Sequence, residues 1–155
     1  MTFYLSKAEE YIAPTAVVYM RRTGSYGQDN MVLMQRFKKW LADNALDGED
    51  TVILAMPLDD PLQTEASQCR YDVCTIYPED RPFDPALVEV RELAGGKYVT
   101  FLLQHTAYAL QNAWQECFAV LPALGYTLDG ARPIMERYQK VLVADHYCEL
   151  CVPVL

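Results

Sequence analysis

The sequence lacks the surplus of basic residues that nucleic-acid-binding proteins carry. Its 155 residues include 13 Lys and Arg against 21 Asp and Glu, which gives a formal net charge of -8. An acidic chain repels a phosphate backbone, and no part of the sequence forms a basic stripe. We therefore expect no direct binding to nucleic acid.

Segments that direct a chain into a membrane are also missing. The sequence has no run of about 18 apolar residues, and its start, residues 1–7, lacks the basic region and apolar core of a signal peptide. The five cysteines, an odd number, fit a reducing compartment better than a set of disulfides. These features predict a cytoplasmic protein that does not interact with membranes.

Familiar catalytic and metal-binding motifs are scarce. There is no GxSxG nucleophile motif and no glycine loop for phosphate, and His105 and His146 are the only histidines. Cys148 and Cys151 have CxxC spacing, but residues three apart on the strand predicted there point to opposite faces. We therefore expect neither a metal nor another cofactor.

What the sequence does contain is one pattern of apolar segments repeated twice. Each copy has a strand, a helix and two further strands, with the first strand and the helix at residues 15–22 and 30–43, and again at 98–105 and 109–124. Thr23 aligns with Thr106, and Asp47 aligns with Asp129 at nearly the same spacing. The chain is therefore predicted to be one α+β domain, residues 1–155, with repeats at about 1–78 and 86–155.

Two more strands are predicted ahead of the repeats, at residues 3–7 and 88–93. The total is then about eight strands and two main helices. The pair Gly95-Gly96 is typical of a hairpin turn, since glycine tolerates positive φ, and predicts that the strand at 88–93 pairs with the strand that follows it.

A strand predicted at residues 133–138 contains an unusual carboxylate. Alternation places Glu136 on the same face as Ile134 and Tyr138, whereas the opposite face, with Arg137, is expected to be wet. The other carboxylates singled out on the strands are expected to be solvated: Asp72 and Glu149. An unpaired carboxylate on a covered face is costly, so Glu136 is a candidate for ligand recognition.

A carboxylate surrounded by aromatic rings suits a large lipophilic cation, because ring faces carry negative potential and the carboxylate supplies charge. The chain has 11 Tyr, 5 Phe and 2 Trp. The rings predicted to approach Glu136 are Tyr138, Trp114, Phe101, Tyr71, Tyr26 and Tyr108. Ordinary core packing is the alternative for each ring. The alternative for Glu136 is an ion pair with a basic residue: Arg22, Arg132 or His105.

Five segments occur in a characteristic order, at residues 18–26, 70–74, 95–98, 133–138 and 148–154. Together they resemble the GyrI-like (gyrase-inhibitor-like) family, which also forms the effector-binding domain of AraC-type and MerR-type regulators. The resemblance implies duplicated β-α-β-β modules of the SHS2 type, with pseudo-twofold symmetry and a ligand cleft between the halves. It also implies that Glu136, with Tyr138 beside it, is the acid that meets cationic ligands.

The resemblance leaves three functions open. The leading hypothesis is a protein that senses or sequesters a hydrophobic, cationic or aromatic xenobiotic, as in multidrug recognition. The second is a hydrolase that detoxifies cyclopropanoid DNA-alkylating compounds, with Glu136 as its catalytic residue. The third is an interaction with a protein partner of the gyrase-inhibitor kind. Because no helix-turn-helix is recognisable, transcriptional control would need a separate regulator as partner.

Overall fold

In a computed structural model that describes residues 2–79 and 81–155, eight antiparallel strands form a single sheet. The strands are β1 (Ser6–Ile12), β2 (Thr15–Thr23), β3 (Val52–Pro57), β4 (Arg70–Ile76), β5 (Glu89–Leu93), β6 (Gly96–Gln104), β7 (Met135–Gln139) and β8 (Tyr147–Pro153). The helices are α1 (Gln28–Asp43), α2 (Ala107–Ala123) and the short α3 (Lys140–Ala144), with a 3₁₀ turn at Ala66–Gln68. None of the helices described is both long and apolar enough to cross a membrane.

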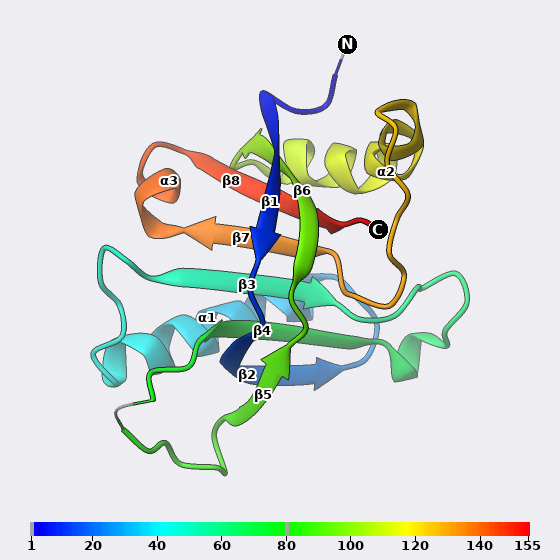
Figure 1. The fold of residues 1–155 in the computed structure, drawn as a ribbon. Coiled ribbons are helices and arrows are strands. Elements are labelled where there is room, and N and C mark those ends of the chain that lie inside the picture. Colours follow the sequence, from blue (N-terminus) through cyan, green and yellow to red (C-terminus); the bar gives the residue numbers. More distant parts are fainter. Residues whose placement is uncertain (1, 80) are drawn as a thin grey trace.

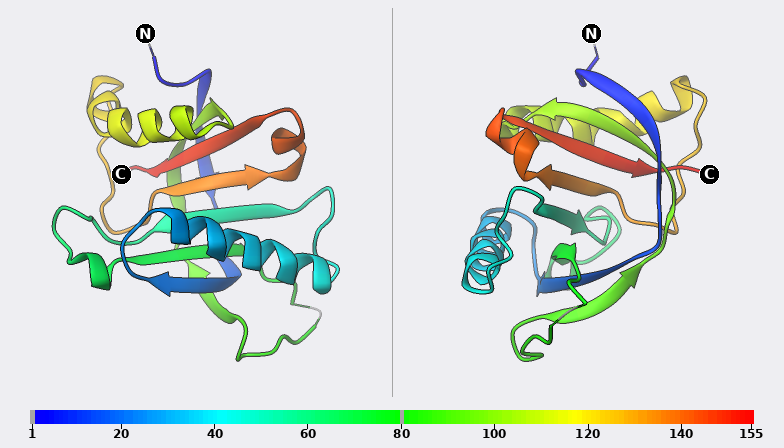
Figure 2. Two further views of the ribbon diagram at one scale, coloured as in Figure 1. Left: turned by 180° about the vertical axis from the view of Figure 1, so that it is seen from behind. Right: turned by 60° about the vertical axis from the view of Figure 1, so that its left-hand side comes forward.

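The predicted duplication is visible in the order of the strands, β1-β6-β8-β7-β3-β4-β2-β5. The units β2-α1-β3-β4 and β6-α2-β7-β8 meet at β3 and β7. On either side of this seam the equivalent strands occur in the same order, β3-β4-β2 in the first unit and β7-β8-β6 in the second. Both main helices lie on one face of the sheet, with β3 and β7 between them (Figure 2, left). The predicted α+β fold with two β-α-β-β modules is confirmed.

The helices form where the sequence has one apolar stripe. In α1 the stripe of Leu33, Phe37 and Leu41 is buried against the sheet, and in α2 the buried residues include Cys117 and Leu121. Thr106 caps the N-terminus of helix α2, and its side chain accepts a hydrogen bond from the Ala109 N–H at 3.1 Å. Each helix therefore covers the strands of its own unit and leaves the seam between the units free.

The predicted hairpin at Gly95-Gly96 is wrong. Strand β5 pairs with β2, and β6 pairs with β1, so the β1–β2 segment and the β5–β6 segment run side by side as two long ribbons (Figure 1). A Cβ on Gly95 would lie 2.4 Å from the Pro14 nitrogen and 2.5 Å from the Ile12 carbonyl oxygen. Gly95 is thus needed for the close approach of two backbones, which is a different use of glycine from a tight turn.

The face opposite the helices is not wet, contrary to the prediction. The sheet curls until the two ribbons pass in front of its middle strands (Figure 1; Figure 2, right). A hydrophobic cluster fills the curl, and in it Met135 is 2% exposed and Cys151 is fully buried. Strand alternation correctly separated the residues of this face from those on the face of Glu136. That this face is covered depends on the pairing of strands distant in sequence, which alternation does not reveal.

Candidate ligand-binding site

A cavity of about 1360 Å³ lies between the two units. It is on the face of the sheet that carries the helices, since both α1 and α2 line it. Its walls come from α1 and the turn before it, α2, β4, β7 and the loops at residues 57–62 and 128–134. The lining side chains include Tyr26, Met31, Met34, Lys38, Leu62, Tyr71, Trp114, Phe118, Glu136 and Tyr138. The volume exceeds that of typical pockets for drug-sized ligands, about 300–1,000 Å³.

The register of the central strands places Glu136 in this cavity without a polar neighbour in the sheet. Glu136 on β7 lies opposite Ala55 of β3 on one side and opposite Leu150 of β8 on the other. Ala55 is small and fully buried, which leaves space above the seam. The half-buried Glu136 carboxylate must therefore find its hydrogen bonds among side chains that project over the sheet.

Two neutral groups provide these hydrogen bonds. The Trp114 Nε1–H of α2 donates to Glu136 Oε2 at 2.6 Å, and the Tyr138 hydroxyl donates to Glu136 Oε1 at 2.6 Å. Within residues 2–79 and 81–155, no Lys, Arg or His forms an ion pair with Glu136. The carboxylate is thus hydrogen-bonded but its charge is not balanced by a cation.

The three basic residues considered as partners of Glu136 make other contacts. Arg22 donates to Asn30 Oδ1 at 2.6 Å, and Arg132 pairs with Asp129 at 2.8 Å. The His105 ring packs on the Tyr138 ring, with 5.3 Å between centroids. The structure therefore does not support the expected alternative of an ion pair.

The protonation of the surrounding groups follows from burial and from the charge of Glu136. Both raise the pKa of the Tyr138 phenol, with burial as the larger cause, and both raise the pKa of Tyr71 in the same order. The two phenols are therefore neutral near pH 7. Partial burial, together with the charge of Lys38, lowers the pKa of His105, and Glu136 opposes this shift.

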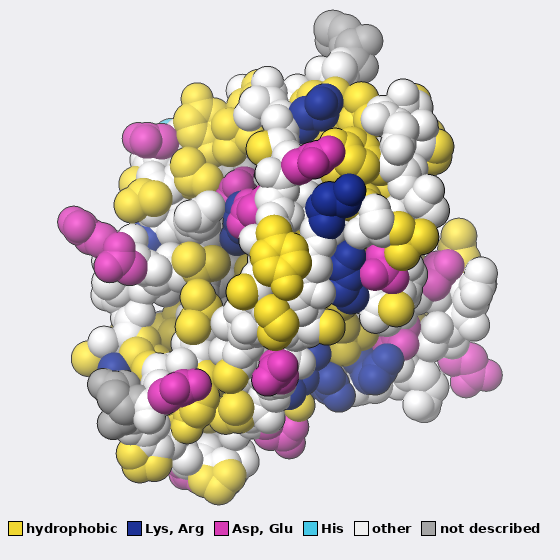
Figure 3. All heavy atoms as spheres, viewed as in Figure 1, with side chains coloured by type: hydrophobic (Ala, Val, Ile, Leu, Met, Phe, Trp, Pro, Cys, Tyr) yellow, Lys and Arg dark blue, Asp and Glu magenta, His cyan; other side chains and the backbone are white. Residues whose placement is uncertain are grey.

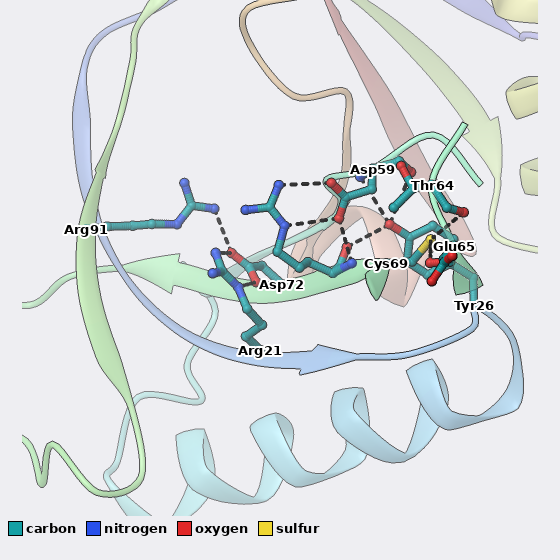
Figure 4. Close-up of polar contacts among 9 residues, drawn as sticks. Arg21, Tyr26, Asp59, Thr64, Glu65, Cys69, Asp72 and Arg91 are labelled. Atoms are coloured by element: carbon teal, nitrogen blue, oxygen red, sulfur yellow. Dashed lines mark hydrogen bonds and ion pairs between the residues drawn. The ribbon is translucent and has the colours of Figure 1, made fainter. Parts of the chain in front are cut away.

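Tyr71 and Tyr26 form the wall on the side of the first unit. Their rings meet edge to face, with 6.4 Å between centroids. The Tyr26 hydroxyl donates to the carbonyls of Arg70, at 2.7 Å, and of Asp59, at 3.2 Å, while Asp59 also pairs with the Arg70 guanidinium at 2.9 Å (Figure 4). These contacts tie the loop at residues 57–62 to β4 and so position one rim of the cavity.

Two of the aromatic residues expected near Glu136 do not line the cavity. Phe101 is fully buried in the core beneath α2, where Phe3 and Tyr4 pack on it with centroids 5.0 Å away. Phe3 and Tyr4 precede β1. The strand predicted at residues 3–7 therefore begins later, at Ser6. Tyr108 lies in the first turn of α2 and is 79% exposed. Five predicted residues line the cavity: Glu136, Tyr138, Trp114, Tyr71 and Tyr26.

Apolar residues at the rim were not predicted. Met31, Phe118 and Leu62 line the cavity and are 64%, 51% and 93% exposed. They extend the apolar lining of the cavity to its exposed rim. The available signal was the width of the apolar side of α1, where Met31 and Met34 lie beside the buried stripe.

A second buried carboxylate lies on the opposite face of the sheet. Asp72 of β4 is fully buried, where solvation was predicted, and accepts hydrogen bonds from Arg21 Nε at 2.6 Å and from Arg91 Nη2 at 2.8 Å (Figure 4). Glu149 is not solvated either, since it pairs with Arg137 at 2.8 Å. On this side of the molecule basic and acidic side chains are interspersed over the crossing ribbons (Figure 3). Both carboxylates are thus neutralised within the protein.

Comparison with known proteins supplies the context for this cavity. A family model described as a GyrI-like small molecule binding domain matches residues 8–155. The chain is 39% identical over 147 residues to the "SPbeta prophage-derived putative transcriptional regulator YosT" of Bacillus subtilis (strain 168), a match that covers 94% of this chain and 96% of that protein. It is 31% identical over 121 residues to DNA gyrase inhibitor 2 of Dickeya dadantii (strain 3937), covering 74% of each.

Solved structures share the fold. An EcmrR–DNA complex in EcmrR-RPo, studied by cryo-EM, matches 96% of this chain with a TM-score of 0.72 and 15% identity, and this chain spans 57% of the EcmrR chain. SAV2435 bound to tetraphenylphosphonium matches 97% of this chain and 94% of its own, with a TM-score of 0.62 and 18% identity. At such low identity these likenesses bear on the fold alone.

Proposed function

The chain belongs to the GyrI-like family of small-molecule-binding domains, and from this premise we propose that it senses or sequesters lipophilic aromatic cations in the cavity between its two units. Glu136 supplies the negative charge, and Trp114, Tyr138, Tyr71 and Tyr26 supply the aromatic walls. The rim residues Met31, Leu62 and Phe118 extend the apolar contact toward solvent.

The observation that carries this proposal is the unbalanced charge of Glu136. A half-buried carboxylate that has two neutral donors, and no ion-pair partner within the described residues, still gains energy from a cationic ligand. The ligand would bring its charge together with apolar surface, which the rings and methionines of the wall can cover. An anionic or neutral ligand of the same shape would gain only the apolar part.

Support from similar proteins concerns the ligand class. SAV2435, which has this fold, binds tetraphenylphosphonium in its solved structure. That cation is large and aromatic, and it cannot form a hydrogen bond with its centre. Its recognition therefore depends on ring contacts and a nearby negative charge, both of which the cavity around Glu136 offers.

A pair of ions with nearly the same shape tests the proposal. We expect tetraphenylphosphonium to quench tryptophan fluorescence on binding, and tetraphenylborate, its anionic counterpart, to bind at least about 10-fold more weakly. In Glu136→Gln the preference should largely disappear. Equal affinities of the two ions for the native protein would overturn the proposal. Mass spectrometry of recovered cyclopropanoid compounds serves as a separate test, because a gain of one water with turnover would favour the hydrolase hypothesis.

Inhibition of DNA gyrase is a second candidate, favoured by the similarity to DNA gyrase inhibitor 2 over 74% of the chain. The contact would be made by the protein surface, since a cavity of about 1360 Å³ does not admit a folded protein. A supercoiling assay with purified gyrase tests this candidate. Unchanged supercoiling at a large excess of the protein would exclude it.

A further inference from the structure

The charged side chains that line the cavity are not equivalent. They are Lys38, Asp59, Asp60, Asp129, Arg132 and Glu136. Asp59 is neutralised by Arg70 at 2.9 Å, and Asp129 by Arg132 at 2.8 Å. The exposed Asp60 accepts the Leu62 backbone N–H at 2.9 Å.

Lys38 is the cation of this set that has no carboxylate partner within residues 2–79 and 81–155. Its neighbour on α1 behaves differently, because Lys39 pairs with Asp43 at 2.7 Å on the outer surface. The charge of Arg132 is balanced by Asp129, and its guanidinium also donates to the Val154 carbonyl at 2.8 Å. Lys38 is therefore free to meet a group on a ligand.

The position of Lys38 gives the cavity a direction. Lys38 follows Asn30, another lining residue, by eight positions, which is about 12 Å along a helix. Asn30 lies in the first turn of α1, near Tyr26, at one end of the cavity. Lys38 therefore lies at the opposite end of the cavity. Glu136 lies on the floor between the units, and the His105 imidazole is influenced by both charges, since Lys38 lowers its pKa and Glu136 raises it.

We propose that Lys38 is a specificity-determining residue and that the cavity favours amphoteric aromatic ligands, which carry a cationic group for Glu136 and an anionic group for Lys38. This inference rests on the proposed function, because it assigns the cationic group of the ligand to Glu136. A ligand with a cation alone would meet repulsion from Lys38, whereas an added carboxylate would turn that repulsion into attraction. The effect is moderate because Lys38 is exposed and screened by water.

Rhodamine 110 and rhodamine 123 are a matched pair of probes, since the second is the methyl ester of the first and differs in lacking the carboxylate. We expect the native protein to bind rhodamine 110 about 3- to 5-fold more tightly by fluorescence polarisation, an effect of the size measured for exposed ion pairs. Lys38→Gln should remove the preference. Lys39→Gln, one position along the same helix, is the control and should keep it.

The outcomes separate this inference from the function on which it rests. Equal binding of both dyes by the native protein, or a preference that persists in Lys38→Gln, would overturn the role of Lys38 and leave the role of Glu136 intact. Binding of tetraphenylphosphonium but of neither dye would have the same meaning. If none of the three probes binds, the proposed function fails and the role of Lys38 fails with it.

Discussion

The buried Asp72 and the half-buried Glu136 lie on opposite faces of the same sheet, and their carboxylates have different partners. Asp72 faces the interior of the curl and is held by two guanidiniums, those of Arg21 and Arg91. Glu136 faces the cleft between the units and is held by an indole and a phenol. The protein neutralises Asp72, whereas Glu136 receives hydrogen bonds but no cationic partner within the described residues. We propose that this difference in charge balance, and not burial alone, distinguishes a ligand-binding carboxylate from a structural one.

The largest effect that tests this comparison should come from Asp72→Asn. The substitution keeps the shape of the side chain but leaves Arg21 and Arg91 without their carboxylate, so we expect a loss of about 3 kcal/mol in the free energy of unfolding. Urea titration followed by circular dichroism measures it. Asp43→Asn, which breaks the exposed pair with Lys39, is the control and should cost about 0.5 kcal/mol or less. A similar loss in both variants would contradict the structural role of Asp72.

A smaller effect is expected from Trp114→Phe, on the other side of the comparison. The variant keeps an aromatic ring but removes the donor to Glu136, and the affinity for tetraphenylphosphonium should fall about 5-fold through weaker positioning of the carboxylate. Isothermal titration calorimetry measures the change. The control is Trp40→Phe. Trp40 lies on α1 and packs against Phe37 in the core, so this variant should leave the affinity for tetraphenylphosphonium unchanged.

The smallest effect concerns pH. Because the pKa of His105 lies below its usual 6.5 in the folded protein, the unfolded chain takes up a proton first as the pH falls. The contribution of His105 to stability is therefore complete above about pH 6.5 and is lost as the pH falls from there toward the lowered pKa. We expect about 0.3 kcal/mol at most, because the ring is largely exposed. The difference in unfolding midpoint between the native protein and His105→Gln, measured from pH 7.5 to pH 5, should shrink at low pH.

The sequence predicted those features that depend on local periodicity. Strand alternation placed Glu136 and Tyr138 on one face, and the helical stripe of α2 pointed to Trp114. All three side chains line the cavity, and Trp114 and Tyr138 each donate a hydrogen bond to Glu136. The agreement is possible because the period of a strand or a helix fixes the direction of a side chain without knowledge of the rest of the fold.

Features that depend on distant pairing could not be predicted in this way. The curl that buries Asp72 arises because β1 pairs with β6 and β5 with β2, and the glycine at the crossing has the same sequence signature as a hairpin turn. Phe101 has the expected inward direction, but Phe3 and Tyr4 fill the space beside it. Which covered face becomes core and which becomes cavity is decided by these long-range contacts.

We propose that Glu136, in the cleft between the units, serves ligand binding, whereas Asp72, inside the curl of the sheet, serves the fold. The most direct test measures tetraphenylphosphonium affinity and urea stability together in Glu136→Gln and in Asp72→Asn. We predict that Glu136→Gln loses at least about 10-fold in affinity with a change in stability below about 1 kcal/mol, and that Asp72→Asn loses stability while the folded fraction binds normally. Native affinity in Glu136→Gln, together with a stability loss as large as that of Asp72→Asn, would contradict the account.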